Sequence, residues 1–217
     1  MSREWEKPDH VTRIYRFFQC LCAAILRVMF DQKGYGEHNV PRTGGVLVVS
    51  NHVSYLDPAI VAAKLPRKFA YLAESYLWGF KPFGWLITRL NAFPVRQGKG
   101  DVGAMKQAIN LLNEGWALTV FPEGMRTLTG RMMPVQAGVA LLLKRANVPV
   151  VPAFIYGAYQ AWPKHNLLPK RGKVRVIYRP AIDFTGQNGR QITEALTKVF
   201  AEMEIEAHAR FAEDIKP

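Results

Sequence analysis

Apolar positions recur along the chain with two different spacings. Between Val11 and Phe30 they fall three or four residues apart, with arginines off that stripe, which predicts an amphipathic helix. Glycines and prolines between Gly34 and Gly45 predict a loop. Beyond this loop, short continuous apolar runs of the kind found in buried strands alternate with longer helical patterns.

This alternation predicts the elements of the rest of the chain. Strands are expected at Val46–Val49, Phe69–Ala73, Ala92–Val95, Trp116–Phe121, Val148–Ile155 and Val174–Tyr178, and helices from Pro58 and over Lys81–Leu90, Asp101–Glu114, Val135–Arg145 and Arg190–Arg210. Asp101 is placed to cap its helix and Gly115 to end it. Strands that alternate with helices predict an α/β fold, a single layered domain with a mixed, mostly parallel sheet flanked by helices.

The composition is that of a globular protein. Of the 217 residues, 49% are hydrophobic and 21% are charged, and the formal net charge is +12. Such a charge favours nucleic acid, an anionic membrane surface or a polyanionic small molecule as partner, without choosing among them. The longest charge-free apolar run near the N-terminus, Phe17–Leu26, is shorter than the roughly 20 residues of a spanning helix, and no secretory signal peptide is evident.

The cysteines and histidines bear on cross-links and metals. Cys20 and Cys22 are the only cysteines, and on a helix they point in different directions, so they cannot form a disulfide with each other. Free thiols fit a reducing compartment. No histidine or cysteine pair has the spacing of zinc ligands, so we expect no metal site.

A histidine and an aspartate follow the first predicted strand. His52 and Asp57 stand between Val46–Val49 and the helix expected from Pro58, at the end of a strand where α/β sheets commonly bind ligands. An unperturbed histidine, with a pKa of about 6.5, accepts a proton at neutral pH, and a carboxylate bonded to its other ring nitrogen fixes the tautomer. Aspartate before proline is also a common helix cap, so Asp57 has a purely structural interpretation as well.

Nothing near this pair marks a nucleophile of the protein itself. The chain has no Gly-x-Ser-x-Gly elbow, and no feature singles out the nearby Ser54. A histidine base at this place is therefore expected to activate a hydroxyl group of the substrate.

A second polar cluster, Phe121–Thr127, follows another predicted strand. Glu123 is an acceptor for hydroxyl groups, and Gly124 lets a ligand approach the backbone closely. Arg126 offers a planar fork that suits phosphate. The cluster therefore has the groups needed to bind a hydroxylated, phosphate-bearing ligand.

A third strand end supplies more positive charge. Arg96 directly follows the strand expected at Ala92–Val95, and Lys99 is close behind it. Each of these cations, like Arg126, would alone be read as an ordinary solvated charge. Their positions at strand ends, in a chain that also carries a His–Asp pair at one, favour a shared site.

These residues, taken in order, resemble the four blocks of the glycerolipid acyltransferases, and most of all the bacterial lysophosphatidate (1-acyl-sn-glycerol-3-phosphate) acyltransferases. The blocks are Asn51-His52-x4-Asp57-Pro58, Phe93-Pro94-Val95-Arg96, Phe121-Pro122-Glu123-Gly124-x-Arg126-Thr127 and Val148-Pro149-Val150-Val151-Pro152. The resemblance covers about Gly44 to Gly157. The first and third blocks together are the specific signal, and the other two are weak alone.

The resemblance implies a role for each block. His52 would deprotonate the acceptor hydroxyl and Asp57 would orient His52, so that the acceptor oxygen attacks the thioester of acyl-CoA or acyl-acyl carrier protein directly, without a cofactor. The residues expected to bind the acceptor, a lysophospholipid, are Arg96, Lys99, Glu123, Gly124, Arg126 and Thr127, with the arginines on its phosphate. The Val148–Pro152 block would line the site. Met125 stands where many relatives carry a small hydroxylated residue, so the resemblance implies a changed hydrogen bond to the acceptor at this position.

The resemblance also implies a membrane partner. We expect residues 1–43 to form a membrane-associating segment, whose helix lies in the interface, and residues 44–217 to form the acyltransferase domain. The place of action would be the cytoplasmic face of the cell membrane, as a peripheral or monotopic protein. A helix packed on the protein core has the same apolar periodicity, so that interpretation stays open.

Three other functions fit some part of the sequence. An acyltransferase of the same family could act on another lysophospholipid or a glycolipid. Gly98–Gly103 matches the dinucleotide fingerprint G-x-G-x-x-G and precedes Glu123, but Pro94 interrupts the short strand before it, so an NAD-dependent enzyme is a remote alternative. A nucleic-acid-binding protein is permitted by the charge, but no motif of that class is present, and we expect no nucleic-acid partner.

Overall fold

Seven strands form one sheet at the centre of the molecule. The computed structural model describes residues 8, 12–96 and 101–215. The strands are β1 (Lys33–Tyr35), β2 (Val46–Ser50), β3 (Phe69–Glu74), β4 (Ala92–Val95), β5 (Ala117–Val120), β6 (Val150–Tyr156) and β7 (Arg175–Tyr178), in the order β1-β7-β6-β2-β5-β3-β4. Neighbouring strands are parallel except for β6 and β7, which confirms the mixed, mostly parallel sheet.

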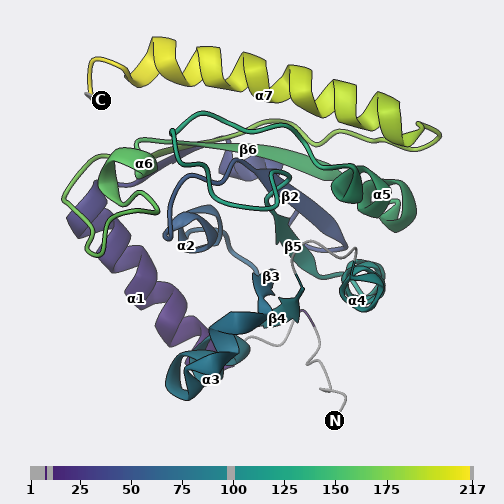
Figure 1. Cartoon of the computed structure of the whole chain (residues 1–217), viewed down its shortest axis with the longest axis horizontal. Coiled ribbons are helices and arrows are strands. Elements are labelled where there is room, and N and C mark those ends of the chain that lie inside the picture. Colours follow the sequence, from purple (N-terminus) through teal and green to yellow (C-terminus); the bar gives the residue numbers. More distant parts are fainter. Residues whose placement is uncertain (1–7, 9–11, 97–100, 216–217) are drawn as a thin grey trace.

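Helices cover both faces of this sheet (Figure 1). They are α1 (Arg13–Phe30), η1 (Glu37–Asn39), α2 (Asp57–Ala62), η2 (Ser75–Gly79), α3 (Lys81–Arg89), α4 (Val102–Asn113), α5 (Ala137–Ala146), α6 (Ala158–Ala161) and α7 (Gly189–Phe211). Helices α4, α5 and α7 share a core with Leu47 and Val49, whereas α1, α2 and α6 share another with Val46 and Val48. Because β2 alternates between two apolar cores, its sequence is a continuous apolar run. The layered α/β fold is confirmed.

The loop predicted over Gly34–Gly45 contains two elements. There, β1 pairs in parallel with β7, and η1 follows it. The prediction of a loop was wrong at these residues because β1 is a three-residue edge strand with no buried side chain, so it leaves no apolar run in the sequence. The division of the chain at residue 43 stays a prediction.

Helices α4 and α1 begin with the caps that their residue types favour. Asp101 caps α4, where its Oδ1 accepts a hydrogen bond from the Ala104 backbone N–H at 3.0 Å. Gly115 follows that helix in the left-handed region, with φ of 89°, as predicted. Thr12 caps α1 by accepting from the Tyr15 N–H at 3.3 Å. Val11, where the helix was predicted to begin, lies outside the described residues.

Helix α1 packs one side against the protein and keeps apolar residues on another. Tyr15, Leu26 and Phe30 are buried, and the Gln19 side chain donates to the carbonyl of Leu65 at 3.0 Å. Five large apolar residues of α1 remain exposed: Ile14, Phe17, Leu21, Ile25 and Val28. They recur three or four residues apart and therefore form one outward stripe, beside which Arg13, Arg16 and Arg27 are also exposed. None of the helices in the described ranges is long and apolar enough to cross a lipid bilayer.

Candidate active site

The loop after β2 is fixed to the neighbouring strand by a buried asparagine. Asn51 Nδ2 donates to the carbonyl of Ile155 at 2.9 Å, and Asn51 Oδ1 accepts from the Ile155 N–H at 2.7 Å. Both bonds are buried, so they fix the first residue after β2 against β6. The next residue along, His52, consequently leaves the sheet edge in a defined direction.

His52 and Asp57 are in direct contact. The His52 Nδ1 atom lies 2.8 Å from Asp57 Oδ2, and the same oxygen accepts from the N–H groups of Val53 at 2.6 Å and Ser54 at 2.7 Å. Burial raises the pKa of the Asp57 carboxyl, and the hydrogen bonds from His52 and the backbone oppose this rise. With Nδ1 directed at Asp57, the other nitrogen of the ring, Nε2, is left to accept a proton.

Asp57 is not the cap of the helix that follows. Helix α2 begins at Asp57 itself, and the cap position is held by Leu56 without a side-chain hydrogen bond. The Asp57 carboxylate turns back to the loop before it. The capping interpretation was wrong because a sequence pattern shows which residue precedes a proline, but not which N–H groups its side chain meets.

The His52 ring is the accessible member of the pair. Its side chain is 18% exposed, whereas that of Asp57 is fully buried. The ring stacks on Phe121, with centroids 4.0 Å apart and planes 15° apart. Phe121 directly follows β5, which pairs with β2, so the pairing of these strands places the Phe121 ring beside His52. This packing fixes the orientation of the ring, which is partly exposed to solvent.

Glu123 holds the backbone of His52. Its Oε1 accepts from the His52 N–H at 2.6 Å and its Oε2 accepts from the Met133 N–H at 2.8 Å. Burial raises the pKa of the Glu123 carboxyl to about 7. Thr127 closes the same junction from the other side, since its N–H donates to the His52 carbonyl at 2.9 Å. Both residues therefore join the loops after β2 and β5.

Gly124 and Arg126 shape the rest of the second loop. Gly124 has φ of 72°, a left-handed conformation that strains any residue with a Cβ. The Arg126 guanidinium lies over the ring of Tyr55, 3.6 Å from its centroid. Its Nη1 is buried and has no hydrogen-bond partner among the described residues. Such a donor is suited to an anionic ligand.

The predicted cations of the third strand end lie farther away. Arg96 follows β4 and is exposed, and β5 and β3 separate β4 from β2. At about 4.8 Å a strand, this places the ends of β4 and β2 about 14 Å apart. Lys99 lies outside the described residues, as do Gly98 and Gly100 of the dinucleotide-like motif. The structure thus brings His52, Asp57, Glu123, Arg126 and Thr127 together and puts Arg96 at the far end of the same edge.

Sequence reasoning missed Tyr55 and Trp162, and it gave Ser54 no role. Tyr55 supports Arg126, and its ring also lies 5.3 Å from that of Trp162. The Ser54 hydroxyl donates a hydrogen bond to the Trp162 carbonyl at 2.8 Å. This bond gives Ser54 a structural role and not that of a nucleophile. Tyr55 stands inside the His–Asp motif and could have been suspected, whereas no pattern pointed to Trp162.

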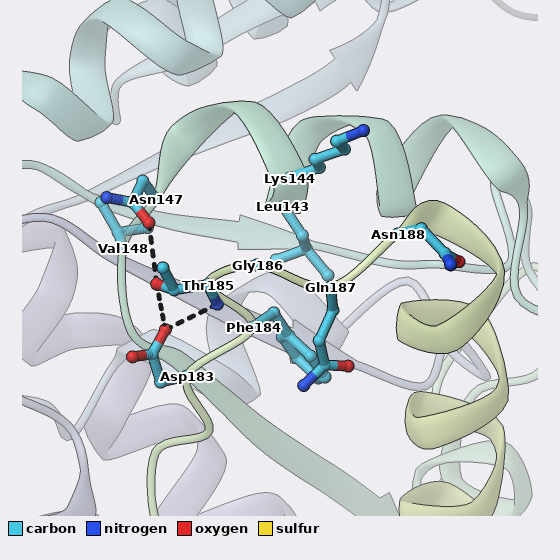
Figure 2. Close-up of a pocket in the computed structure, with 10 residues that line it drawn as sticks. All are labelled: Leu143, Lys144, Asn147, Val148, Asp183, Phe184, Thr185, Gly186, Gln187 and Asn188. Atoms are coloured by element: carbon cyan, nitrogen blue, oxygen red, sulfur yellow. Dashed lines mark hydrogen bonds between the residues drawn. The ribbon is translucent and has the colours of Figure 1, made fainter.

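A cavity of about 210 Å³ lies at the amino-terminal ends of the parallel strands, opposite to the end that carries His52 (Figure 2). It is formed by the end of α5 and the segment before α7, where the Thr185 hydroxyl donates to Asn147 Oδ1 at 2.9 Å. The parallel strands begin at that edge, and His52 stands where they end. The cavity is therefore separate from the candidate site. The described parts of the chain contain no group of three or more His, Cys, Asp or Glu side chains that could hold a metal ion.

The fold and the site define an α/β protein whose accessible histidine is held by a buried carboxylate at the carboxyl edge of the sheet. The chain belongs to the Acyltransferase family, whose model matches residues 32–156, and it is an O-acyltransferase. This membership favours the acyltransferase interpretation over a dinucleotide-binding or nucleic-acid-binding one.

Similar proteins differ in how much of the chain they match. A 1-acyl-sn-glycerol-3-phosphate acyltransferase of Bacillus subtilis is 28% identical over 203 residues, which cover 88% of this chain and 97% of that protein. A lyso-ornithine lipid O-acyltransferase of Pseudomonas aeruginosa is 35% identical over 131 residues, or 56% of this chain and 48% of that protein. The chain spans about half the length or less of several plant relatives.

The fold also matches a crystal structure. A 1-acyl-sn-glycerophosphate acyltransferase from Thermotoga maritima superposes with a TM-score of 0.77, at 24% identity, over 88% of this chain and 79% of that one. At that identity the likeness concerns the fold, and it agrees with the sheet and flanking helices described above.

Proposed function

We propose that the protein transfers a fatty acyl group from acyl-CoA or acyl-acyl carrier protein to the free hydroxyl of 1-acyl-sn-glycerol-3-phosphate, giving phosphatidate. The observation that carries this proposal is the 2.8 Å contact of His52 Nδ1 with the buried Asp57, which leaves the exposed side of the ring as a base. The names of relatives that match most of the chain's length point to the same acceptor.

The reaction proceeds by direct attack. His52 Nε2 takes the proton of the acceptor hydroxyl while Asp57 stabilises the imidazolium that forms. The acceptor oxygen bonds to the thioester carbonyl carbon, the carbon–sulfur bond then breaks, and the thiolate takes the proton from His52 to leave as a thiol. Ser54, whose hydroxyl is used by the Trp162 carbonyl, forms no acyl intermediate. No step calls for a metal or cofactor.

Arg126 binds the phosphate of the acceptor. Its buried Nη1 has no partner among the described residues, and the Tyr55 ring fixes the plane of the guanidinium. Gly124 lets the acceptor approach the loop backbone. Thr127 contributes by holding its loop against the His52 carbonyl through its N–H group. Arg96 and Lys99 stay candidates for a more distant part of the substrate.

A lysolipid without a phosphate is the second candidate acceptor. The highest percentage identity among the relatives described above is with a lyso-ornithine lipid O-acyltransferase, over little more than half of the chain. The catalytic pair would act in the same way on either hydroxyl, so the two functions differ only in whether Arg126 binds a phosphate group of the acceptor.

The acceptor is held in a membrane, and α1 anchors the protein to it at the cytoplasmic face. The outward stripe of α1 is apolar and is flanked by three exposed arginines, an arrangement suited to an interface with anionic lipid.

The proposed function is tested by an acyl-transfer screen. Radiolabelled acyl-CoA and acyl-acyl carrier protein are each offered with lysophosphatidate and with lyso-ornithine lipid. We expect label in phosphatidate with the wild type and roughly a hundredfold to ten-thousandfold less with His52→Ala, at unchanged circular dichroism. Turnover of lyso-ornithine lipid alone would make the second candidate the function, and wild-type turnover by His52→Ala would overturn the mechanism.

A further inference from the structure

The segment between α6 and β7 exposes two adjacent leucines. In residues 162–172, called here the Leu-Leu loop, Leu167 is 94% exposed and Leu168 is 76% exposed. A single exposed leucine on a protein surface calls for no explanation, but a neighbouring pair this open to water is a contiguous apolar projection.

The loop is ordered by its own hydrogen bonds. The Asn166 N–H donates to the Pro163 carbonyl at 3.1 Å, and the Trp162 indole N–H donates to the Asn166 carbonyl at 3.0 Å. At the base, the Lys170 N–H donates to the Ala161 carbonyl at 2.7 Å. The leucines are therefore held outward by a closed loop, and their exposure is a property of the fold.

The charge around the leucines has one sign. Lys164, Lys170 and Arg171 are exposed on either side of them, and residues 162–172 contain no aspartate or glutamate. An apolar tip between cations is complementary to a surface that is anionic outside and apolar inside, which describes a bilayer with anionic headgroups. A protein partner would need to supply both an acidic surface and an apolar pocket.

The loop joins the candidate active site to α1. Ser54, inside the His–Asp motif, donates to the Trp162 carbonyl at 2.8 Å, and the Tyr55 hydroxyl donates to the Lys164 carbonyl at 3.3 Å. At its other end, the Gly172 N–H donates to the carbonyl of Met29, next to the exposed Val28. In Figure 1 the green segment after α6 accordingly lies against the end of α1.

We propose that the Leu-Leu loop is a second membrane contact, which inserts Leu167 and Leu168 into an anionic bilayer and holds the mouth of the His52 site at the lipid surface. The outward stripe of α1 alone is a single narrow line of contact, so it would leave the protein able to rock about the helix axis. A second contact, bonded directly to the loop that carries His52 and Asp57, removes that freedom and turns the base toward the lipids.

Vesicle flotation of the full chain tests the insertion. The vesicles are phosphatidylcholine with and without phosphatidylglycerol, and the variant carries Leu167→Gln and Leu168→Gln. We expect its binding to the anionic vesicles to be about tenfold weaker, because two side chains lose their apolar transfer. Ile205→Gln is the matched control, since Ile205 is 71% exposed on α7, which packs on the other face of the sheet, and it should bind like the wild type.

A charge variant separates insertion from simple attraction. Lys170→Gln with Arg171→Gln should weaken binding to the anionic vesicles by about fivefold for each residue and leave binding to pure phosphatidylcholine unchanged. If the charge variant loses binding while the leucine variant floats like the wild type, the loop is only an electrostatic contact and the insertion is wrong. Loss of binding to the same degree in Ile205→Gln would likewise overturn it.

The inference rests on the proposed function for the nature of the acceptor. Activity is therefore measured with two forms of the acceptor, one held in vesicles and one dissolved. The leucine variant should lose activity about tenfold on lysophosphatidate held in vesicles and keep it on a short-chain analogue dissolved as monomers. A wild type inactive on both acceptors would overturn the proposed function while the flotation result still decides the membrane contact. Equal activity of variant and wild type on the vesicles would overturn the contact.

Discussion

At the scale of single residues, Asp57 Oδ2 accepts hydrogen bonds from the His52 ring and from two backbone N–H groups. An asparagine there keeps the shape but carries no negative charge, so its amide oxygen holds the ring more weakly, and an amide N–H2 group turned toward the ring forces the wrong tautomer. We expect Asp57→Asn to lower the turnover number by about ten-thousandfold with the fold retained. Steady-state kinetics beside circular dichroism check this, and turnover within tenfold of the wild type would remove Asp57 from catalysis.

Glu123 makes stability depend on pH. Burial raises its pKa to about 7 from an ordinary 4.5, so the folded protein binds a proton more tightly than the unfolded chain between these values. This tighter proton binding stabilises the folded protein. The stabilisation is complete below pH 4.5 and is lost as the pH rises through 7. Relative to the wild type, Glu123→Gln should therefore gain roughly 2 to 3 kcal/mol in free energy of unfolding from pH 5 to pH 8.

Denaturant unfolding of both proteins at the two pH values measures this gain. Glu202→Gln, at an exposed position of α7, is the control for the loss of one carboxylate. A difference between wild type and Glu123→Gln that does not change with pH would show that Glu123 does not titrate in this range. The same geometry makes Glu123 a positioning residue, because both of its oxygens meet backbone N–H groups.

Arg126 is expected to act on substrate binding rather than turnover. Its guanidinium is already oriented by Tyr55, so Arg126→Ala should raise the Michaelis constant for a phosphate-bearing acceptor roughly tenfold to hundredfold. Arg126→Lys should recover part of the loss, since it keeps the charge but not the planar fork. Arg131→Ala, an exposed arginine of the same segment, is the control. An equal effect at both positions would point to general charge and not to a phosphate site.

At the scale of elements, the sequence predicted strands best where both faces of the sheet are covered. The apolar run of β2 is continuous because its side chains alternate between two cores. The edge strand β1 and the four-residue helix α6 leave no such pattern, since β1 has no buried side chain and α6 is a single turn. The His–Asp pair was visible in the sequence, but the backbone bonds made by Glu123 depend on loop geometry that spacing does not contain.

Helix α1 has a buried side that packs on the protein and an exposed apolar side that we propose binds the membrane. Substituting Phe17, Leu21 and Val28 together by glutamine changes only exposed positions, so the protein should fold normally and bind anionic vesicles at least tenfold more weakly. Leu26→Ala, on the buried side, should instead destabilise the fold by about 2 to 5 kcal/mol. Flotation and thermal unfolding measure the two effects. Vesicle binding by the triple variant equal to that of the wild type would mean that α1 is not the anchor.

At the scale of the whole molecule, the two proposed membrane contacts lie on one side of the sheet. Helix α1 packs in the core that also contains α6, and the Leu-Leu loop follows α6 directly. Helices α4, α5 and α7 cover the other face (Figure 1). Two apolar contacts that flank the His52 loop would let an acceptor reach the base without leaving the lipid surface completely.

The protein has 29 basic and 17 acidic residues, so an electrostatic attraction to an anionic membrane is expected, and salt would screen it. The screening length falls from about 10 Å at about 0.1 M salt to about 3 Å at about 1 M, whereas insertion of apolar side chains is not weakened by salt. Binding to vesicles with phosphatidylglycerol should therefore fall at least tenfold over this range, down to the level seen with pure phosphatidylcholine, which should hardly change. Flotation at both salt concentrations measures this, and binding to anionic vesicles that resists about 1 M salt would mean that the net charge has no part in membrane recognition.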